Sequence, residues 1–215
     1  MKKRYLLTLV LMPILLVACG GGQPAAPTGV VVTPQVAGSP VPTVIGNPKV
    51  QDLENKAATS EDAETHFQLG NAYAETGRYP EAETAFRRAL EIDPNHLDAK
   101  SNLGVIYYKQ GRLTEAERLF RQVLAVNPDD AEILYNLGGA LAAQQKLDEA
   151  VVEFIKASEA DPDLAQPYLG LGTVYQAQGK KAEAIEALQK YVEMSDDPTW
   201  REQAKSMLRQ LGVDD

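Results

Sequence analysis

Apolar residues recur at helical spacing over most of the chain, from about residue 63 to residue 211. Phe67, Leu69 and Tyr73 fall on one face of a helix, and Ala82 and Phe86 do the same in the next segment. Intervals of three and four residues between apolar positions are typical of amphipathic α-helices. No segment makes a convincing strand, so the pattern predicts an all-α domain of paired helices.

The helical pattern repeats every 34 residues. A Leu-Gly pair that begins at Leu69 recurs at this interval, together with a small Ala and an aromatic residue or Leu. Such a period indicates stacked helical units, each too small to bury its apolar face alone. The matched positions define four gapless units, at 63–96, 97–130, 131–164 and 165–198.

Gly, Asn and Asp mark the inside and the ends of the predicted helices. Gly70 and its equivalents fall inside helices at a cost of about 1 kcal/mol each, which implies a close helix approach; we expect Ala82 and its equivalents to form the other small surface. The first helices should end at left-handed C′ residues, and the second helices should be followed by N-caps that form capping boxes. The predicted C′ residues are Gly77, Gly111, Gln145 and Gly179. The predicted caps are Asn95, Asp129 and Asp163, paired with Asp98, Glu132 and Gln166.

Two further helices should cover the ends of the array. At the N-terminal end, Val50, Leu53 and Ala57 suggest a capping helix within 48–62. At the C-terminal end, residues 199–215 form a closing helix and a tail, with Trp200 and Ala204 on its apolar side.

These 34-residue units resemble the tetratricopeptide repeat, a helix–turn–helix unit. The resemblance implies a right-handed superhelical solenoid of antiparallel helix pairs. It also implies that the first helices line a concave groove that binds a peptide or helix of a partner protein. The candidate groove residues are Glu64, Phe67, Asn71, Asp98, Asn102, Tyr108, Glu132, Tyr135, Asn136, Leu169 and Thr173. Some of the aromatic residues among them, Phe67 above all, could instead fill space between repeats.

One subgroup of this family binds chaperone tails through a clamp of basic and Asn side chains. The corresponding positions in this sequence are Phe67, Asn71, Asn102, Glu132 and Asn136. All three basic residues of the clamp are missing, so a carboxylate tail would lack its charge-assisted partners. The aromatic and acidic groove residues instead favour a ligand segment with apolar anchors and nearby Lys or Arg.

The N-terminus reads as an export signal. Three basic residues precede thirteen uncharged ones, a length that suits a secretory signal peptide but is short for a membrane span. The junction Leu16-Val17-Ala18-Cys19 resembles the lipobox of bacterial lipoproteins, which implies a signal peptide at 1–18 and lipidation of Cys19. A disulfide has no second Cys in the chain, and the neighbours of Cys19 are unsuited to a core that would bury a thiol.

Residues 19–47 predict a flexible tether between the lipidated Cys and the helical domain. The segment from Gly20 to Asn47 has no charged residue, five prolines and six glycines. Without residues 1–18, the chain carries 18 Lys plus Arg against 30 Asp plus Glu, a formal charge of 18 − 30 = −12. This balance disfavours nucleic acid as a partner of the folded part.

The sequence offers no catalytic constellation, and we expect no enzyme activity, cofactor or metal. Its two histidines, His66 and His96, lack further His or Cys partners at ligand spacing. The resemblance therefore suggests a lipid-anchored adaptor that helps assemble or position a complex of the cell envelope. The alternative is a self-associating structural module without a peptide ligand. Either would sit on the outer face of the cytoplasmic membrane or in the outer membrane.

Overall fold

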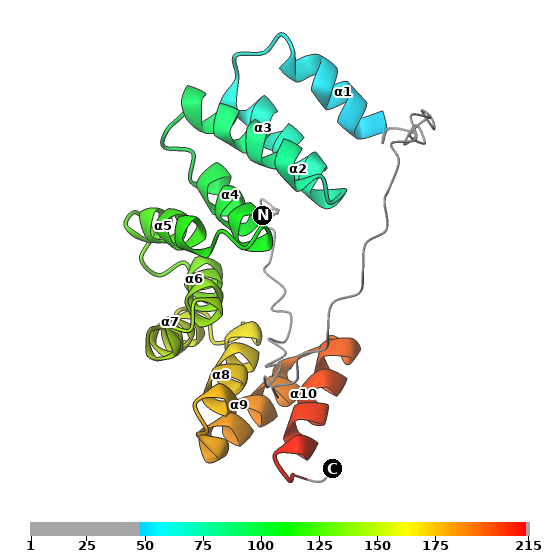
Figure 1. The fold of residues 1–215 in the computed structure, drawn as a ribbon. Helices are drawn as coiled ribbons and strands as arrows, with labels where there is room; N and C mark the ends of the chain where they lie inside the picture. Colours follow the sequence, from blue (N-terminus) through cyan, green and yellow to red (C-terminus); the bar gives the residue numbers. More distant parts are fainter. Residues whose placement is uncertain (1–47, 214–215) are drawn as a thin grey trace, which may run out of the picture.

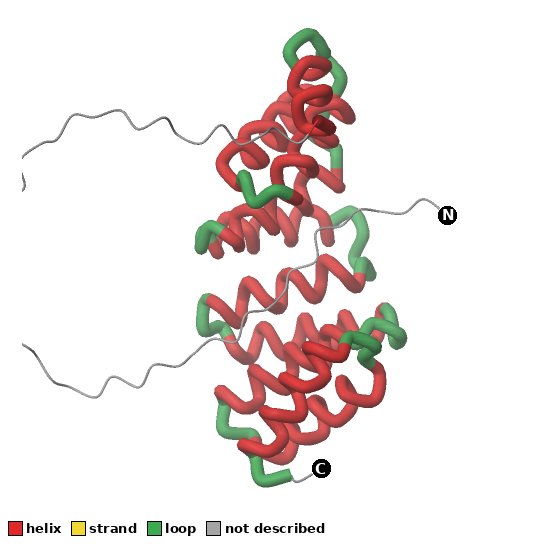
Figure 2. The backbone as a smooth tube through the Cα atoms, turned by 90° about the vertical axis from the view of Figure 1, so that its right-hand side faces the viewer, coloured by secondary structure: helices red, strands yellow, loops and turns green. Residues whose placement is uncertain are grey.

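The computed structural model describes residues 48–213, and all regular structure within this range is helical (Figures 1 and 2). The predicted signal peptide, Cys19 and the tether lie outside the described residues. The helices are α1 (Pro48–Ala57), α2 (Ala63–Glu75), α3 (Tyr79–Ile92), α4 (Leu97–Lys109), α5 (Leu113–Leu124), α6 (Ala131–Ala143), α7 (Leu147–Ala160), α8 (Gln166–Ala177), α9 (Lys181–Met194) and α10 (Pro198–Gln210). None of these helices is both long and apolar enough to cross a membrane.

The helices form an arc in which each packs against the next along the chain, as Figure 1 shows. Repeats 1 to 4 correspond to the pairs α2–α3, α4–α5, α6–α7 and α8–α9. In Figure 1, α4, α6 and α8 follow the inner side of the arc, whereas α5 and α7 lie on its outer side. The predicted all-α solenoid is confirmed, with α1 and α10 at its two ends.

One aromatic position of the repeat builds the continuous core. Phe86, Phe120 and Phe154 are fully buried in the main core on the second helices of repeats 1 to 3, whereas Leu188, at the same position in repeat 4, is fully buried in a separate C-terminal cluster. Smaller clusters close the ends: Val50 of α1 packs with the first repeat, and Leu208 of α10 packs with the last. The end helices cover the apolar faces of the terminal repeats, so that the array exposes polar surface to solvent at both ends.

The helix-internal glycines make room for these aromatic rings. A Cβ on Gly70 would lie 2.6 Å from Cδ1 of Phe86, and one on Gly104 would lie 2.7 Å from Cε1 of Phe120. The ring four residues after Ala82 is thus the nearest neighbour of Gly70, and in repeat 4 the carbonyl oxygen of Ala184, the counterpart of Ala82, would lie 3.6 Å from a Cβ on Gly172. The close approach itself is confirmed.

The predicted C′ residues are confirmed, but the predicted caps are wrong. Gly77, Gly111 and Gly179 have φ values of 73–76°, and Gln145 has φ 63°. His96 caps α4 and Asp130 caps α6, whereas α8 has no side-chain cap. The backbone N–H groups of Asn95 and Asp163 bond instead to the carboxylates of Asp93 and Asp161, at 2.9 and 3.0 Å. This turn uses additional residues, so the helices begin after the predicted caps and the capping boxes do not form.

The candidate partner-binding groove

The first helices of the repeats bring a row of amide side chains to the inner side of the arc. Asn102 of α4 donates from Nδ2 to Oδ1 of Asn71 on α2, at 2.7 Å. Asn136 of α6 occupies the place of Asn102 one repeat later. Both Asn102 and Asn136 are 1% exposed, although Asn is a mediocre helix former that most often lies at helix ends. Buried Asn residues inside helices are therefore expected to form hydrogen bonds with their side chains.

Part of this amide row has unused hydrogen-bonding capacity. Oδ1 of Asn102 and both amide atoms of Asn136 have no hydrogen-bond partner among residues 48–213. An unpaired buried polar group costs about 1–3 kcal/mol, but surrounding side chains cover these atoms; the partly exposed Asn71 is the member of the row that a ligand can reach with donors and acceptors. A peptide backbone offers both kinds of group at regular intervals.

Tyrosines flank the amide row. Tyr135, which precedes Asn136, is 4% exposed, and its ring centroid lies 5.8 Å from that of Phe154. Tyr108 is half-buried on α4, and burial raises the pKa of its hydroxyl. Tyr135 is therefore part of the core and not of the groove surface, whereas Tyr108 keeps a partly exposed ring beside the amides, a combination that suits protein recognition.

Three other predicted groove residues have partners within the described chain. The ring of Phe67 lies 5.9 Å from Phe86 and 4.7 Å from His96, so it fills space between repeats 1 and 2. Leu169 belongs to the C-terminal core cluster. Thr173 donates its hydroxyl to the carbonyl of Leu169 at 2.9 Å, within α8.

The acidic residues lie along the helix starts. The side chain of Glu64 is 56% exposed, and its carboxylate is 3.7 Å from Nε2 of His96. Asp98 and Glu132 are half-buried in the first turns of α4 and α6. These three carboxylates place negative charge at one edge of the groove, in the first turns of three successive inner helices.

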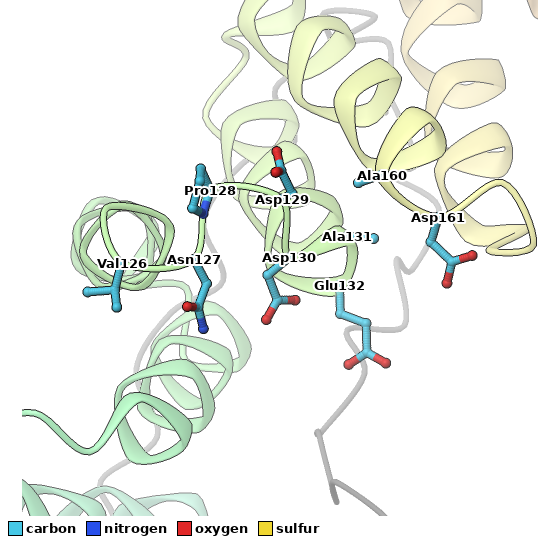
Figure 3. A pocket seen from close by; sticks show the side chains of 9 residues that line it. All are labelled: Val126, Asn127, Pro128, Asp129, Asp130, Ala131, Glu132, Ala160 and Asp161. Carbon is cyan, nitrogen blue, oxygen red and sulfur yellow. The ribbon is translucent and has the colours of Figure 1, made fainter.

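A shallow cavity of about 590 Å³ accompanies this edge, between the α5–α6 loop and the end of α7. Figure 3 shows the side chains of Asp130 and Glu132 pointing to one side of the loop and that of Asp129 pointing to the other. The carboxylates therefore diverge instead of converging on one point. Within residues 48–213, no three His, Cys, Asp or Glu side chains come together as metal ligands.

The two histidines have structural contacts. Nε2 of His66 lies 3.1 Å from the carbonyl oxygen of Ser60. Nδ1 of His96 accepts from the backbone N–H of Ala99 at 3.3 Å, which caps α4. Each ring is thus engaged in holding a helix start.

Sequence reasoning missed a set of contacts on the outer side of the arc. Glu83 of repeat 1 receives hydrogen bonds from Arg112 and Gln110 of repeat 2, at 2.8 and 3.0 Å. One repeat later, Glu117 receives bonds from Lys146 and Gln144, at 2.8 and 2.9 Å. Each of these three positions recurs at the 34-residue spacing, which is the signal that could have revealed them.

A family model described as "Tetratricopeptide repeat" matches residues 73–137, 107–166 and 141–211. The chain belongs to the tetratricopeptide-repeat (TPR) family. TPR proteins bind other proteins or peptides, and the fold is typically a non-enzymatic scaffold. A comparison with curated proteins gave no match.

Several solved TPR structures are similar to this chain. A MamA fragment from Desulfovibrio magneticus RS-1 is 28% identical with a TM-score of 0.64, and the alignment covers 69% of this chain and 86% of that one. YrrB, described as a TPR protein with an unusual peptide-binding site, is 26% identical with a TM-score of 0.63, over 74% and 86%. TTC0263 from Thermus thermophilus is 24% identical with a TM-score of 0.63, over 70% and 83%, and shows the fold alone.

Proposed function

We propose that this TPR protein is a membrane-anchored adaptor that holds a segment of another protein in its concave groove. By holding that segment near a membrane, it would help to assemble or position a complex of the cell envelope. The observation that carries the proposal is the row of Asn71, Asn102 and Asn136 on successive inner helices, of which Asn71 is partly exposed and bonded to Asn102. An extended peptide backbone matches such a row of side-chain donors and acceptors.

The groove residues also suggest the side chains of the ligand. The partly exposed Tyr108 offers apolar contact area with a polar tip, which favours an apolar anchor in the partner. Glu64, Asp98 and Glu132 favour Lys or Arg near those anchors, because like charges at the edge would repel an acidic segment. The similarity to YrrB, a TPR protein described by its peptide-binding site, is in line with a peptide ligand.

The anchor is proposed from the sequence. The lipobox-like junction before Cys19 supports attachment of acyl chains, and each buried methylene contributes about 0.8 kcal/mol of membrane binding. In polyproline geometry, the uncharged residues 20–47 would reach up to about 85 Å, at ~3.1 Å per residue. Such a tether would let the TPR domain work away from the bilayer surface.

The test of groove binding is photo-crosslinking in the native cell from a reactive group at Tyr108. The matched control carries the same group at Arg87, whose side chain is 53% exposed on α3. We expect an adduct with one other protein from Tyr108 and none from Arg87. Adducts only with a second copy of the chain would support the self-associating module instead, and a folded chain without adducts from Tyr108 would contradict groove binding.

The test of anchoring is separate. Cys19→Ser should move the chain from the membrane fraction to the soluble fraction and abolish incorporation of a labelled fatty acid. If the variant stays in the membrane fraction and still takes up label, lipidation at Cys19 is wrong, whatever the result of crosslinking.

A further inference from the structure

The outer side of the arc has ion pairs that link the second helix of one repeat to the next repeat. Glu83 pairs with Arg112 across the junction between repeats 1 and 2, and Glu117 pairs with Lys146 across the next junction, both at 2.8 Å. The latter junction has a second link, because Arg121 of α5 pairs with Glu149 of α7 at 3.2 Å. These ion pairs connect adjacent repeats on the outer side of the arc.

Both kinds of link are replaced at the junction between repeats 3 and 4. Val151 stands where repeat 2 has Glu117, and Ile155 stands where repeat 2 has Arg121. Lys180 keeps the place of Lys146 but forms no ion pair among the described residues; its Nζ lies 5.7 Å from the ring centroid of Tyr175. One polar link remains, a hydrogen bond of 2.9 Å from Gln178 to Asp148.

A cavity of about 590 Å³ opens on repeat 4 at this junction. Tyr168, Leu171 and Tyr175 of α8 and Ala187 of α9 form its apolar part. All the lining residues belong to repeat 4, but Tyr175 takes the place of Tyr107, which accepts a hydrogen bond from Arg87 of the preceding repeat, and Glu183 takes the place of Glu149, which pairs with Arg121; the cavity therefore lies on the face of repeat 4 that is next to repeat 3. At the position of Ala187, repeat 1 has the buried Ala85 and repeat 2 the buried Leu119.

The surroundings of the cavity combine exposed apolar surface with negative charge. On the neighbouring helix α7, Val152 and Ile155 are 49% and 38% exposed and are two of the three large apolar residues exposed among residues 48–213; neither lines the cavity itself. Three carboxylates line the cavity against the single Lys190; they belong to Glu183, Glu186 and Glu193. Burial, with a contribution from two of these glutamates, raises the pKa of the Tyr175 hydroxyl.

We infer that this repeat 3–4 junction is a second protein-binding surface, which takes a segment with one large apolar side chain flanked by Lys or Arg. The apolar side chain would lie between Tyr168 and Tyr175 over Ala187, and the basic groups would pair with the glutamates at the rim. The three carboxylates outnumber Lys190 and the nearby Lys180, a balance that favours a cationic segment and opposes acidic segments or an anionic lipid surface. The surface is separate from the concave groove, so the inference does not depend on the proposed function.

The repeat itself supplies the variants that test this inference. Ala187→Leu fills the cavity with the residue of repeat 2, and Ile155→Arg restores the Arg that pairs across the preceding junction, now opposite Glu183. Both changes copy a side chain that this fold already carries, so neither should unfold the chain, and a thermal melt of each variant checks this. Thr84→Arg is the matched control, because Thr84 is exposed on α3, lies outside both the junction and the groove, and gains the same charge that Arg118 carries at this position of repeat 2.

The probe is a short capped peptide with Phe-Leu flanked on each side by Lys-Arg, titrated into the mature chain carrying Cys19→Ser. NMR signals of the Ala187 methyl group and of the Tyr168 and Tyr175 rings should shift saturably. Ala187→Leu and Ile155→Arg should each weaken binding by about tenfold or more, whereas Thr84→Arg should leave it unchanged. A peptide with Glu in place of the basic residues should not bind.

Three results would overturn the inference. They are the absence of saturable shifts at these residues, equal binding of the charge-reversed peptide, and unchanged binding by folded Ala187→Leu. Shifts confined to the concave groove would overturn it as well while supporting groove binding. The fates of the two proposals can therefore be told apart in one titration.

Discussion

Gln145 adopts a backbone conformation that the other three repeats give to glycine. Its φ is 63°, at the C′ position after α6, where Lys146 and Gln145 donate to the carbonyls of Leu141 and Ala142. A non-glycine residue in the left-handed region costs roughly 1–2 kcal/mol. Glycine removes this cost, but its greater freedom in the unfolded chain offsets part of the gain. We therefore predict that Gln145→Gly raises the free energy of unfolding by about 0.5–1 kcal/mol, as measured by urea denaturation.

Gln144, the preceding residue, is the control for this prediction. Its φ is −82°, and its side chain donates to Glu117 at 2.9 Å, so Gln144→Gly should destabilise the protein. If both substitutions lower the stability, strain at Gln145 is not the reason for the effect.

Glu117 makes stability depend on pH. Burial opposes its ionisation, but hydrogen bonds from Lys146, Gln144 and Arg121 outweigh burial and lower its pKa from 4.5 to about 2. Because the folded-state pKa is depressed, the carboxylate stabilises the fold above the unfolded-state value and loses this effect as pH falls through the folded-state value. We predict that Glu117→Gln costs on the order of 2 kcal/mol at pH 7 and almost nothing near pH 2.

Urea denaturation of both proteins between pH 7 and pH 2 measures this difference. Glu91→Gln is the control, because the Arg88–Glu91 pair has side chains 49% and 64% exposed and such pairs contribute about 0–1 kcal/mol. A stability difference for Glu117→Gln that stays constant with pH would mean that its carboxylate is not held in the ionised form by these bonds.

At the scale of the helix, Asp62 shows how a start is stabilised. Its carboxylate accepts from the backbone N–H groups of Glu64 and Thr65, at 3.4 and 3.2 Å, and from the Thr65 hydroxyl at 2.9 Å. We predict that Asp62→Ala lowers the free energy of unfolding by about 1 kcal/mol. Asp163→Ala, at a predicted cap that the structure does not use, should change it by less than about 0.5 kcal/mol. Equal losses in chemical denaturation would contradict this assignment of caps.

The misplaced caps show which parts of an element a single sequence determines. The 34-residue period places every helix, because it reports the apolar positions that face the core. The start of a helix depends on whether a turn closes at Asp93 or one residue later, a choice between local hydrogen bonds of similar strength. Likewise, Gly70 predicts a close contact, but only the packed structure shows that Phe86 makes it.

At the scale of the molecule, the repeat predicted a continuous core and two covered ends, and both are present. The pairing of Asn71 with Asn102 and the ion pairs of the outer side were not predicted, because they join residues about one repeat apart. Predicting such pairs requires the relative rotation of adjacent repeats, and a periodic sequence pattern does not determine that rotation. Only the observed ion pairs show that Val151 and Ile155 replace residues that link adjacent repeats.

The missing ion pairs predict where the solenoid opens first. In a linear array, stability is approximately a sum of repeat and junction contributions, so a weak junction lets one end unfold separately. Beyond the repeat 3–4 junction, Leu188 packs with Leu169, Tyr191 and Leu208 in a cluster separate from the main core. We predict that amide hydrogen exchange is faster in α8 to α10 than in α4 to α7, and that Val151→Glu slows it by pairing with Lys180.

The size of this effect follows from the exposed character of the restored pair. A surface ion pair contributes about 0.2–1 kcal/mol, which corresponds to a slowing of exchange by roughly 1.4- to 5-fold in α8 to α10. Val152→Glu, which places the same charge on the adjacent exposed residue of α7, should have no such effect. If both variants slow exchange equally, general charge is responsible; if α8 to α10 already exchange as slowly as α4 to α7, the junction is not weak. A change confined to Val151→Glu would show that one replaced carboxylate lets the last repeat open ahead of the other three.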